Sequence, residues 1–62
     1  MMIQFTRTDG RVVSINPAHI RSVDLYGNDD SCIITFAKDD FITITGKYQM
    51  VVNTIDAALK DR

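Results

Sequence analysis

The segment KYQMVVNTIDAALKD, residues 47–61, carries the clearest pattern in this sequence of 62 residues. Its apolar residues recur three, four and seven positions apart, the spacing that places side chains on one face of an α-helix. Asp56 precedes Lys60 by four residues, an order that favours an ion pair along a helix. Lys60 and Arg62 also suit the negative end of the helix dipole. We therefore expect a C-terminal amphipathic helix over residues 47–61, with an apolar stripe of Tyr48, Val51, Val52, Ile55, Ala58 and Leu59.

Short segments rich in β-branched residues precede this helix. Valine, isoleucine and threonine favour strands, and all eight acidic residues are aspartate, which favours turns over helix interiors. Asn16 is a good helix N-cap and Pro17 fits the first helical position, so residues 16–20 should form one helical turn. Alternation of apolar and polar residues around it predicts strands over residues 2–6, 11–15, 21–26, 31–36 and 41–45.

The first two strands should form a hairpin. Asp9 can accept a hydrogen bond from the backbone ahead of it, and Gly10 can adopt positive φ, so the two residues predict a tight loop. In the second strand we expect Val13 and Ile15 to point inward and their neighbours outward. The adjacent valines 12 and 13 leave this register weakly specified.

These elements predict a single domain over residues 1–62 with an α+β fold. We expect a five-stranded antiparallel meander, curled or partly barrel-like, with the helix packed on its concave face. Neither a sheet face nor a helix stripe can hide its apolar side alone, so the two should share one core. The predicted core consists of Ile3, Phe5, Ile15, Ile20, Val23, Leu25, Ile34, Phe36, Ile42, Ile44, Tyr48, Val51, Val52, Ile55 and Leu59.

Composition and charge disfavour several classes of protein. No apolar run approaches the roughly 20 residues that span a bilayer, and the first residues lack the pattern of a secretory signal. We therefore expect no membrane insertion and a cytoplasmic location. The formal net charge is -1, whereas proteins that bind nucleic acid usually carry a basic excess, so the charge balance disfavours nucleic acid as a partner. Acids interrupt the only candidate basic patch, made of Arg7, Arg11, Arg21 and Lys38.

The residues that could carry chemistry lack the partners that catalysis or metal binding requires. His19, the only histidine, has no readable nucleophile or acid pattern beside it, and we interpret it as a structural residue. Cys32 alternates with apolar residues, which is typical of a small buried side chain. The aspartate pairs at 29–30 and 39–40 flank a strand of about 20 Å, so they are interpreted as turn residues. We predict no enzyme activity, no catalytic residue, no cofactor and no metal.

An outward-facing apolar set predicts a contact surface for protein partners. It comprises Val12, Ile33 and Phe41, and Met50 on the back of the helix is a further candidate. A monomer rarely exposes contiguous apolar surface on a sheet, and a domain this small gains stability from a second subunit. We therefore predict a homo-oligomer. Light scattering should give a mass that falls on dilution, and a constant monomer mass at micromolar concentration would refute the prediction.

Several short motifs are spread over residues 3–55. They are Ile3-Gln4-Phe5-Thr6-Arg7 with Asp9-Gly10, Ile15-Asn16 with Ile20, residues 34–36, and Val51, Val52 and Ile55 in the helix. Together these motifs resemble the FlbD family of small bacterial flagellar and swarming-motility proteins, also called the SwrD type. The chain departs from the family pattern at Asp9, at the turn of residues 28–30, at Asp39 and at Gly46-Lys47.

This resemblance implies a non-enzymatic cytoplasmic accessory protein that affects flagellar motor performance or assembly. The implied partners are flagellar motor or export components. Two alternatives stay open: a small phage or mobile-element protein, and a nucleic-acid-binding module like the LytTR type. The last predicts retention on DNA that falls steeply with salt.

The helix orientation predicts the effect of one substitution. Ile55→Asp places an unpaired charge in the middle of the apolar stripe, and burial of such a charge is strongly unfavourable. We expect the variant to be unfolded in circular dichroism at room temperature. A cooperative thermal transition like that of the unmodified chain would refute the orientation.

Overall fold

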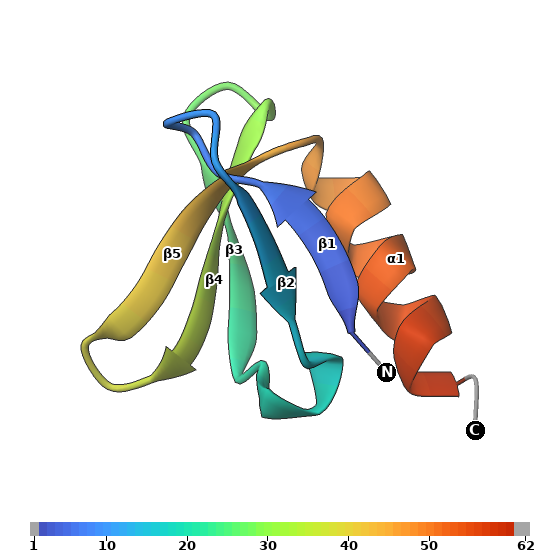
Figure 1. The fold of residues 1–62 in the computed structure, drawn as a ribbon. Helices are drawn as coiled ribbons and strands as arrows, with labels where there is room; N and C mark the ends of the chain where they lie inside the picture. Colours follow the sequence, from blue (N-terminus) through green and yellow to red (C-terminus); the bar gives the residue numbers. More distant parts are fainter. Residues whose placement is uncertain (1, 61–62) are drawn as a thin grey trace.

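The computed structural model describes residues 2–60, and its strands form two small sheets (Figure 1). Strands β1 and β2 make a two-stranded antiparallel hairpin, and β3, β4 and β5 make a three-stranded antiparallel sheet. The elements in chain order are β1 (Ile3–Thr6), β2 (Val12–Ile15), the 3₁₀ turn η1 (Pro17–His19), β3 (Ser22–Tyr26), β4 (Ser31–Ala37), β5 (Asp40–Thr45) and α1 (Tyr48–Lys60).

The predicted five-stranded meander is therefore wrong, and residues 2–60 form no closed barrel. The reason lies at the break between β2 and β3. Asn16 caps η1, with its Oδ1 accepting a hydrogen bond from the Ala18 N–H at 3.0 Å, and Pro17 is buried. This turn was predicted, but it redirects the chain so that β3 does not pair with β2. Proline has no N–H to continue a ladder, so the sheet ends here.

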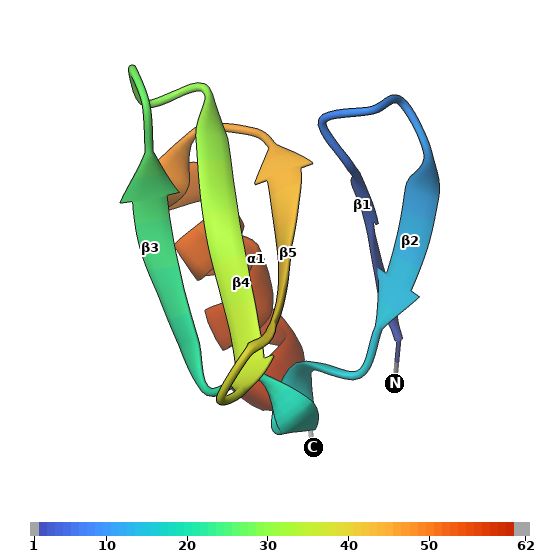
Figure 2. The ribbon, with the colours of Figure 1, turned by 90° about the vertical axis from the view of Figure 1, so that its left-hand side faces the viewer.

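The two sheets meet at one crossing. The tip of the hairpin crosses the end of β5, where Arg7 forms an isolated bridge with Ile44 (Figure 1). The Thr8 N–H donates to the Thr43 carbonyl at 3.2 Å, and the Thr45 hydroxyl donates to the Thr6 carbonyl at 3.0 Å. Away from this crossing the hairpin stands apart from the larger sheet (Figure 2).

The hairpin itself has the predicted loop and register. Gly10 has φ of 92°, and the Arg11 N–H donates to the Asp9 carboxylate at 3.0 Å. Val13 lies opposite Phe5 and Ile15 opposite Ile3, which puts both residues of β2 on the inner face. Ile15 is buried and Val13 half-buried, so the expected inward orientation is confirmed.

Helix α1 lies against one face of the three-stranded sheet (Figure 2). Its buried line is Val51, Ile55 and Ala58, spaced as successive turns of one face. These side chains pack against inward-facing residues of β4 and β5 and against the end of β2, and together they form the core. The cluster of buried residues consists of Ile15, Cys32, Ile34, Ile44, Val51 and Ile55.

Two predicted core residues are at the surface instead. Leu25 is 53% exposed because β3 is an edge strand, with no further strand beside it among residues 2–60. Leu59 is 41% exposed because it lies on the flank of the stripe, next to the buried Ala58. The other predicted core residues are buried or half-buried.

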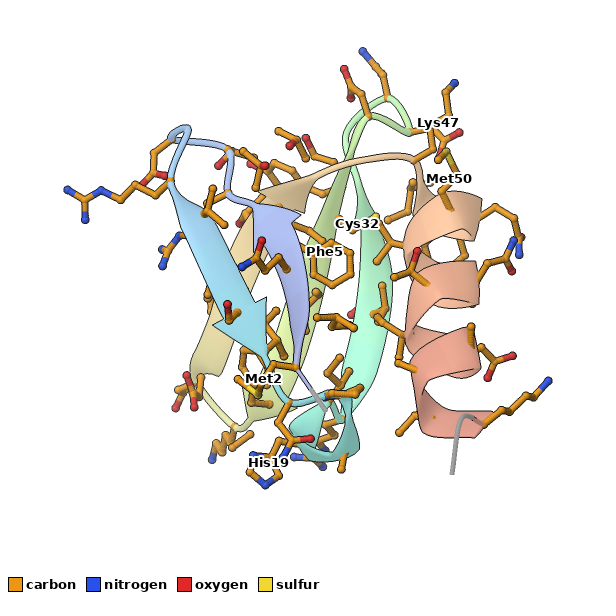
Figure 3. All side chains as sticks on the ribbon, turned by 45° about the vertical axis from the view of Figure 1, so that its right-hand side comes forward. Met2, Phe5, His19, Cys32, Lys47 and Met50 are labelled. Carbon is orange, nitrogen blue, oxygen red and sulfur yellow. The ribbon has the colours of Figure 1, made fainter. Side chains whose placement is uncertain are left out.

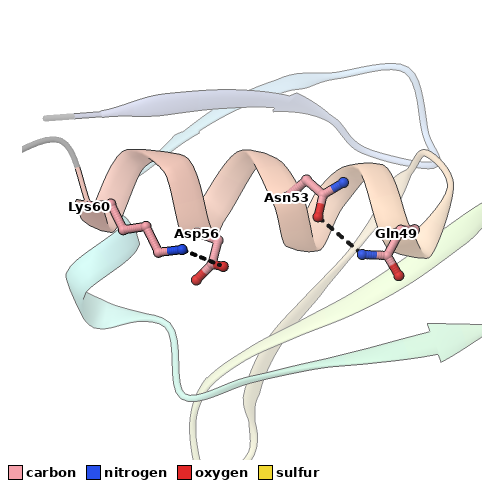
Figure 4. A network of polar contacts seen from close by, with 4 residues as sticks. All are labelled: Gln49, Asn53, Asp56 and Lys60. Carbon is pink, nitrogen blue, oxygen red and sulfur yellow. Dashed lines mark hydrogen bonds and ion pairs between the residues drawn. The ribbon is translucent and has the colours of Figure 1, made fainter.

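Polar contacts follow the solvent side of α1 (Figure 4). The predicted pair of Asp56 and Lys60 is present at 3.6 Å between Oδ2 and Nζ, and Gln49 donates to the Asn53 side chain at 3.0 Å. Both pairs join residues four apart, and such exposed contacts contribute only about 0.2–0.5 kcal/mol each. The helix is described to Lys60, so its predicted end at Asp61 and the role of Arg62 lie outside the described residues.

The start of α1 is fixed by the turn between β3 and β4. The Asp29 carboxylate accepts a hydrogen bond from the Tyr48 N–H at 3.1 Å, and the Gly46 N–H donates to the Asp30 carbonyl at 2.9 Å. The first N–H groups of a helix have no partner within the helix, so Asp29 supplies one from a distant loop. Gly46 has φ of 139°, and a Cβ there would lie 3.2 Å from Val51 Cγ2.

Removal of this cap should weaken the fold measurably. Asp29→Ala deletes the acceptor and also places alanine at φ of 65°. Asp39→Ala is the matched control, because Asp39 has φ of 64° and its carboxylate makes no hydrogen bond within residues 2–60. In urea unfolding we expect Asp29→Ala to lower the free energy of unfolding by about 0.5–2 kcal/mol more than the control substitution does. Equal losses would show that the cap contributes nothing.

Candidate functional site

An open cleft of about 620 Å³ lies between β2 of the hairpin and the β4–β5 part of the larger sheet. Figure 3 shows Met2 and His19, two of its lining residues, near the same end of the molecule. The apolar lining comes from Met2, Val13, Ile15, Phe36 and Ile42. The polar lining comes from Ser14, Asn16, His19 and Asp40.

The divergence of the two sheets exposes the floor of this cleft. Near the crossing, Ile44 is completely buried, but Ile42, two residues away on the same face of β5, is only half-buried. Val13 of β2 and Phe36 of β4 are half-buried as well. In the cleft, inward-facing apolar side chains of the two sheets therefore remain partly exposed to solvent.

Three lining residues have the types found in a serine–histidine–acid triad. Ser14, His19 and Asp40 come from β2, η1 and the start of β5. None of their side chains takes part in a hydrogen bond or ion pair within residues 2–60. A triad activates its nucleophile through hydrogen bonds of about 2.6–3.2 Å, and the cleft does not supply them. Its polar groups form a rim rather than a converging set.

The aspartate pairs have structural positions at opposite ends of β4. Asp29 caps α1 from the β3–β4 turn, and Asp29 and Asp39 both have positive φ. The interpretation as turn residues is confirmed for Asp29, Asp30 and Asp39, whereas Asp40 is the first residue of β5. Within residues 2–60, no three His, Cys, Asp or Glu side chains lie close enough together to hold a metal ion.

Cys32 is a buried thiol, as predicted. It is 0% exposed, and its Sγ donates to the Gly46 carbonyl at 3.6 Å. Burial raises the pKa of the thiol, and the nearby Asp29 carboxylate raises this pKa further, because both disfavour the thiolate. Cys32 is therefore protonated at neutral pH and serves packing next to the start of α1.

The four residues predicted as a contact surface lie on three separate parts of the molecule. Ile33 and Phe41 share the outer face of the three-stranded sheet, where Phe41 is 57% exposed and Ile33 half-buried. Val12 lies on the outer face of the hairpin, opposite Thr6. Met50 projects from the first turn of α1 beside a smaller pocket of about 190 Å³ (Figure 3). The structure does not join them into one patch.

The four residues of the candidate basic patch, Arg7, Arg11, Arg21 and Lys38, lie in two separate groups. Arg7 and Arg11 lie at the tip of the hairpin, where the Arg7 N–H donates to the Arg11 carbonyl. Arg21 precedes β3 and Lys38 lies in the turn between β4 and β5. Because these two groups sit at opposite ends of the strands, they form no continuous basic surface.

Comparison of the chain with protein-family models, with curated proteins and with solved structures finds no significant match. The resemblance to the FlbD family therefore stays a prediction. In residues 2–60, α1 is too short and too polar to cross a membrane, and no other helix is a candidate.

Proposed function

We propose that this chain is a non-enzymatic protein-interaction module that binds its partner in the cleft between β2 and β5. The observation that supports this most directly is the incompletely covered apolar floor, made of Val13, Phe36 and Ile42. A partner that covers this floor removes apolar surface from water, and this burial contributes about 25 cal/mol of favourable binding free energy per Å².

The chemistry of the rim favours binding over catalysis. Enzyme sites place hydrogen-bonded acid, base and nucleophile around one reacting atom. Here the Cys32 thiol is buried and does not line the cleft, and His19 and Asp40 make no polar contact with each other within residues 2–60. Apolar contact with a few polar groups at the rim is the usual composition of a protein-binding surface.

We place this module in the cytoplasm, as an accessory protein of the flagellar motor or export apparatus that also self-associates. The basis is the resemblance of the motifs in β1, β4 and α1 to the FlbD family. The outer face of the larger sheet, with Ile33 and Phe41, is the surface we assign to self-association, because it lies on the far side of the sheet from α1.

Two methionine variants test the cleft as the partner site. The tagged chain is used to capture a panel of purified flagellar motor and export proteins, and affinity for any captured protein is measured by calorimetry. Met2→Glu changes an exposed residue of the cleft wall, and Met50→Glu changes an equally accessible methionine on α1. We expect Met2→Glu to weaken binding more than about tenfold, because a buried methionine contributes roughly 1.5–3 kcal/mol, and Met50→Glu to leave it unchanged.

If Met50→Glu weakened binding and Met2→Glu did not, the partner site would be on α1 instead of in the cleft. Failure to capture any protein of the panel would contradict the motility role. Retention on DNA that declines steeply with salt would instead favour the nucleic-acid alternative.

A further inference from the structure

The outer edge of β2 has unpaired main-chain groups. The Arg7 N–H donates to the Arg11 carbonyl, and the register then pairs Phe5 with Val13 and Ile3 with Ile15. Main-chain groups alternate in direction along a strand, so those of Val12 and Ser14 point away from β1. Neither residue makes a main-chain hydrogen bond to any other element in residues 2–60.

Strand β5 has a matching free edge. The Thr43 carbonyl accepts from the Thr8 N–H, so the main-chain groups of Thr43 point away from β4. Those of Phe41, two residues earlier, point the same way. Within residues 2–60 they make no hydrogen bond, because the hairpin pairs with β5 only at the crossing near Ile44.

These two edges border the same cleft. Ser14 lines it on the β2 side, and Asp40 and Ile42, which flank Phe41, line it on the β5 side. In Figure 2, β5 is the strand of the larger sheet that lies next to the hairpin. The cleft thus offers main-chain donors and acceptors along both walls and apolar side chains along its floor, which together are the requirements of a missing strand.

We propose that the cleft binds an extended peptide segment of a partner protein, which adds as a strand between β2 and β5. This inference rests on the proposed function and specifies how the partner is recognised. Alternate residues of the peptide face the floor, so the peptide is apolar at every second position. The residues between them face solvent.

The occupant is a free segment of another protein rather than a strand of a second folded copy. Every strand of a second copy already has a neighbour on one side, so it cannot pair with both walls. Asp40 is the only carboxylate that lines the cleft and has no cationic partner within residues 2–60, so it favours a lysine or arginine in the peptide.

A phage-displayed library of random dodecapeptides, selected on the full chain, is the probe for this proposal. We expect the selected peptides to be apolar at alternate positions and to carry a basic residue near one end. Selection on Asp40→Lys should replace that basic residue by an acidic one. Peptides without alternation, or with the same charge preference on both chains, would contradict the proposed mode.

Two proline variants test the main-chain contact. Ser14→Pro removes an N–H that points into the cleft, without deleting a hydrogen bond to β1. Gln4→Pro is the matched control, because Gln4 lies directly opposite Ser14 and its N–H points to the other edge of the hairpin. We expect Ser14→Pro to weaken binding of a selected peptide about tenfold more than Gln4→Pro does, as expected for loss of a strand hydrogen bond. Equal effects would overturn strand addition.

N-methylated forms of the selected peptide give a second measurement on the unmodified chain, which does not depend on the folding of a variant. Methyl groups on alternate nitrogens block the hydrogen bonds to one wall, and methyl groups on the other nitrogens block those to the opposite wall. Both forms should bind at least tenfold more weakly. Unchanged binding of both forms would overturn the proposal. A captured partner whose affinity depends on Met2 but not on Ser14 would support the proposed function and contradict strand addition.

Discussion

The anchoring of α1 on the turn between β3 and β4 is the constraint on which the remaining structure depends. Asp29 caps the helix, the Asp30 carbonyl accepts from the Gly46 N–H, and the Cys32 thiol donates to the Gly46 carbonyl, so three groups within residues 29–32 fix where the helix starts. From that start Val51 and Ile55 fall on the inner face of the sheet and bury its central strand. A helix that started elsewhere would direct its apolar stripe away from this face.

One helix of this length cannot cover five strands. A helix is about 10 Å wide and neighbouring strands lie about 4.8 Å apart, so α1 shields little more than the three-stranded sheet. The hairpin is left with its tip crossed over β5 and with its far end diverging. Because α1 does not also cover the space between the hairpin and the larger sheet, a cleft remains there with a half-buried apolar floor and two unpaired strand edges. A partner strand would complete the layer that the chain does not complete alone.

The polar side chains serve the fold at its turns more than they serve chemistry. Asp9 and Asn16 each satisfy a nearby backbone N–H, and Asp29 satisfies that of the helix. Cys32 is protonated and buried, and His19 lies at the rim of the cleft without a hydrogen-bonded acid within residues 2–60. Main-chain groups at open strand edges are therefore the most available recognition elements, which is consistent with a module that binds extended protein segments.

The sequence by itself determined the local structure, because local structure depends on neighbours along the chain. The helix stripe, the Asn16-Pro17 turn, the Asp9-Gly10 loop and the inward orientation of Val13 and Ile15 all follow from spacing and backbone preference. Only the tertiary structure decided that the β1–β2 hairpin and the sheet of β3, β4 and β5 are separate, because this grouping is set by the path of the chain after Pro17 and by the area that α1 covers. The same limit explains why Val12, Ile33 and Phe41, which alternation placed in one outward-facing set, lie on two different sheets. The cleft was invisible in the sequence because it is lined by residues distant along the chain, from Met2 to Ile42, whose separation depends on the angle between two sheets.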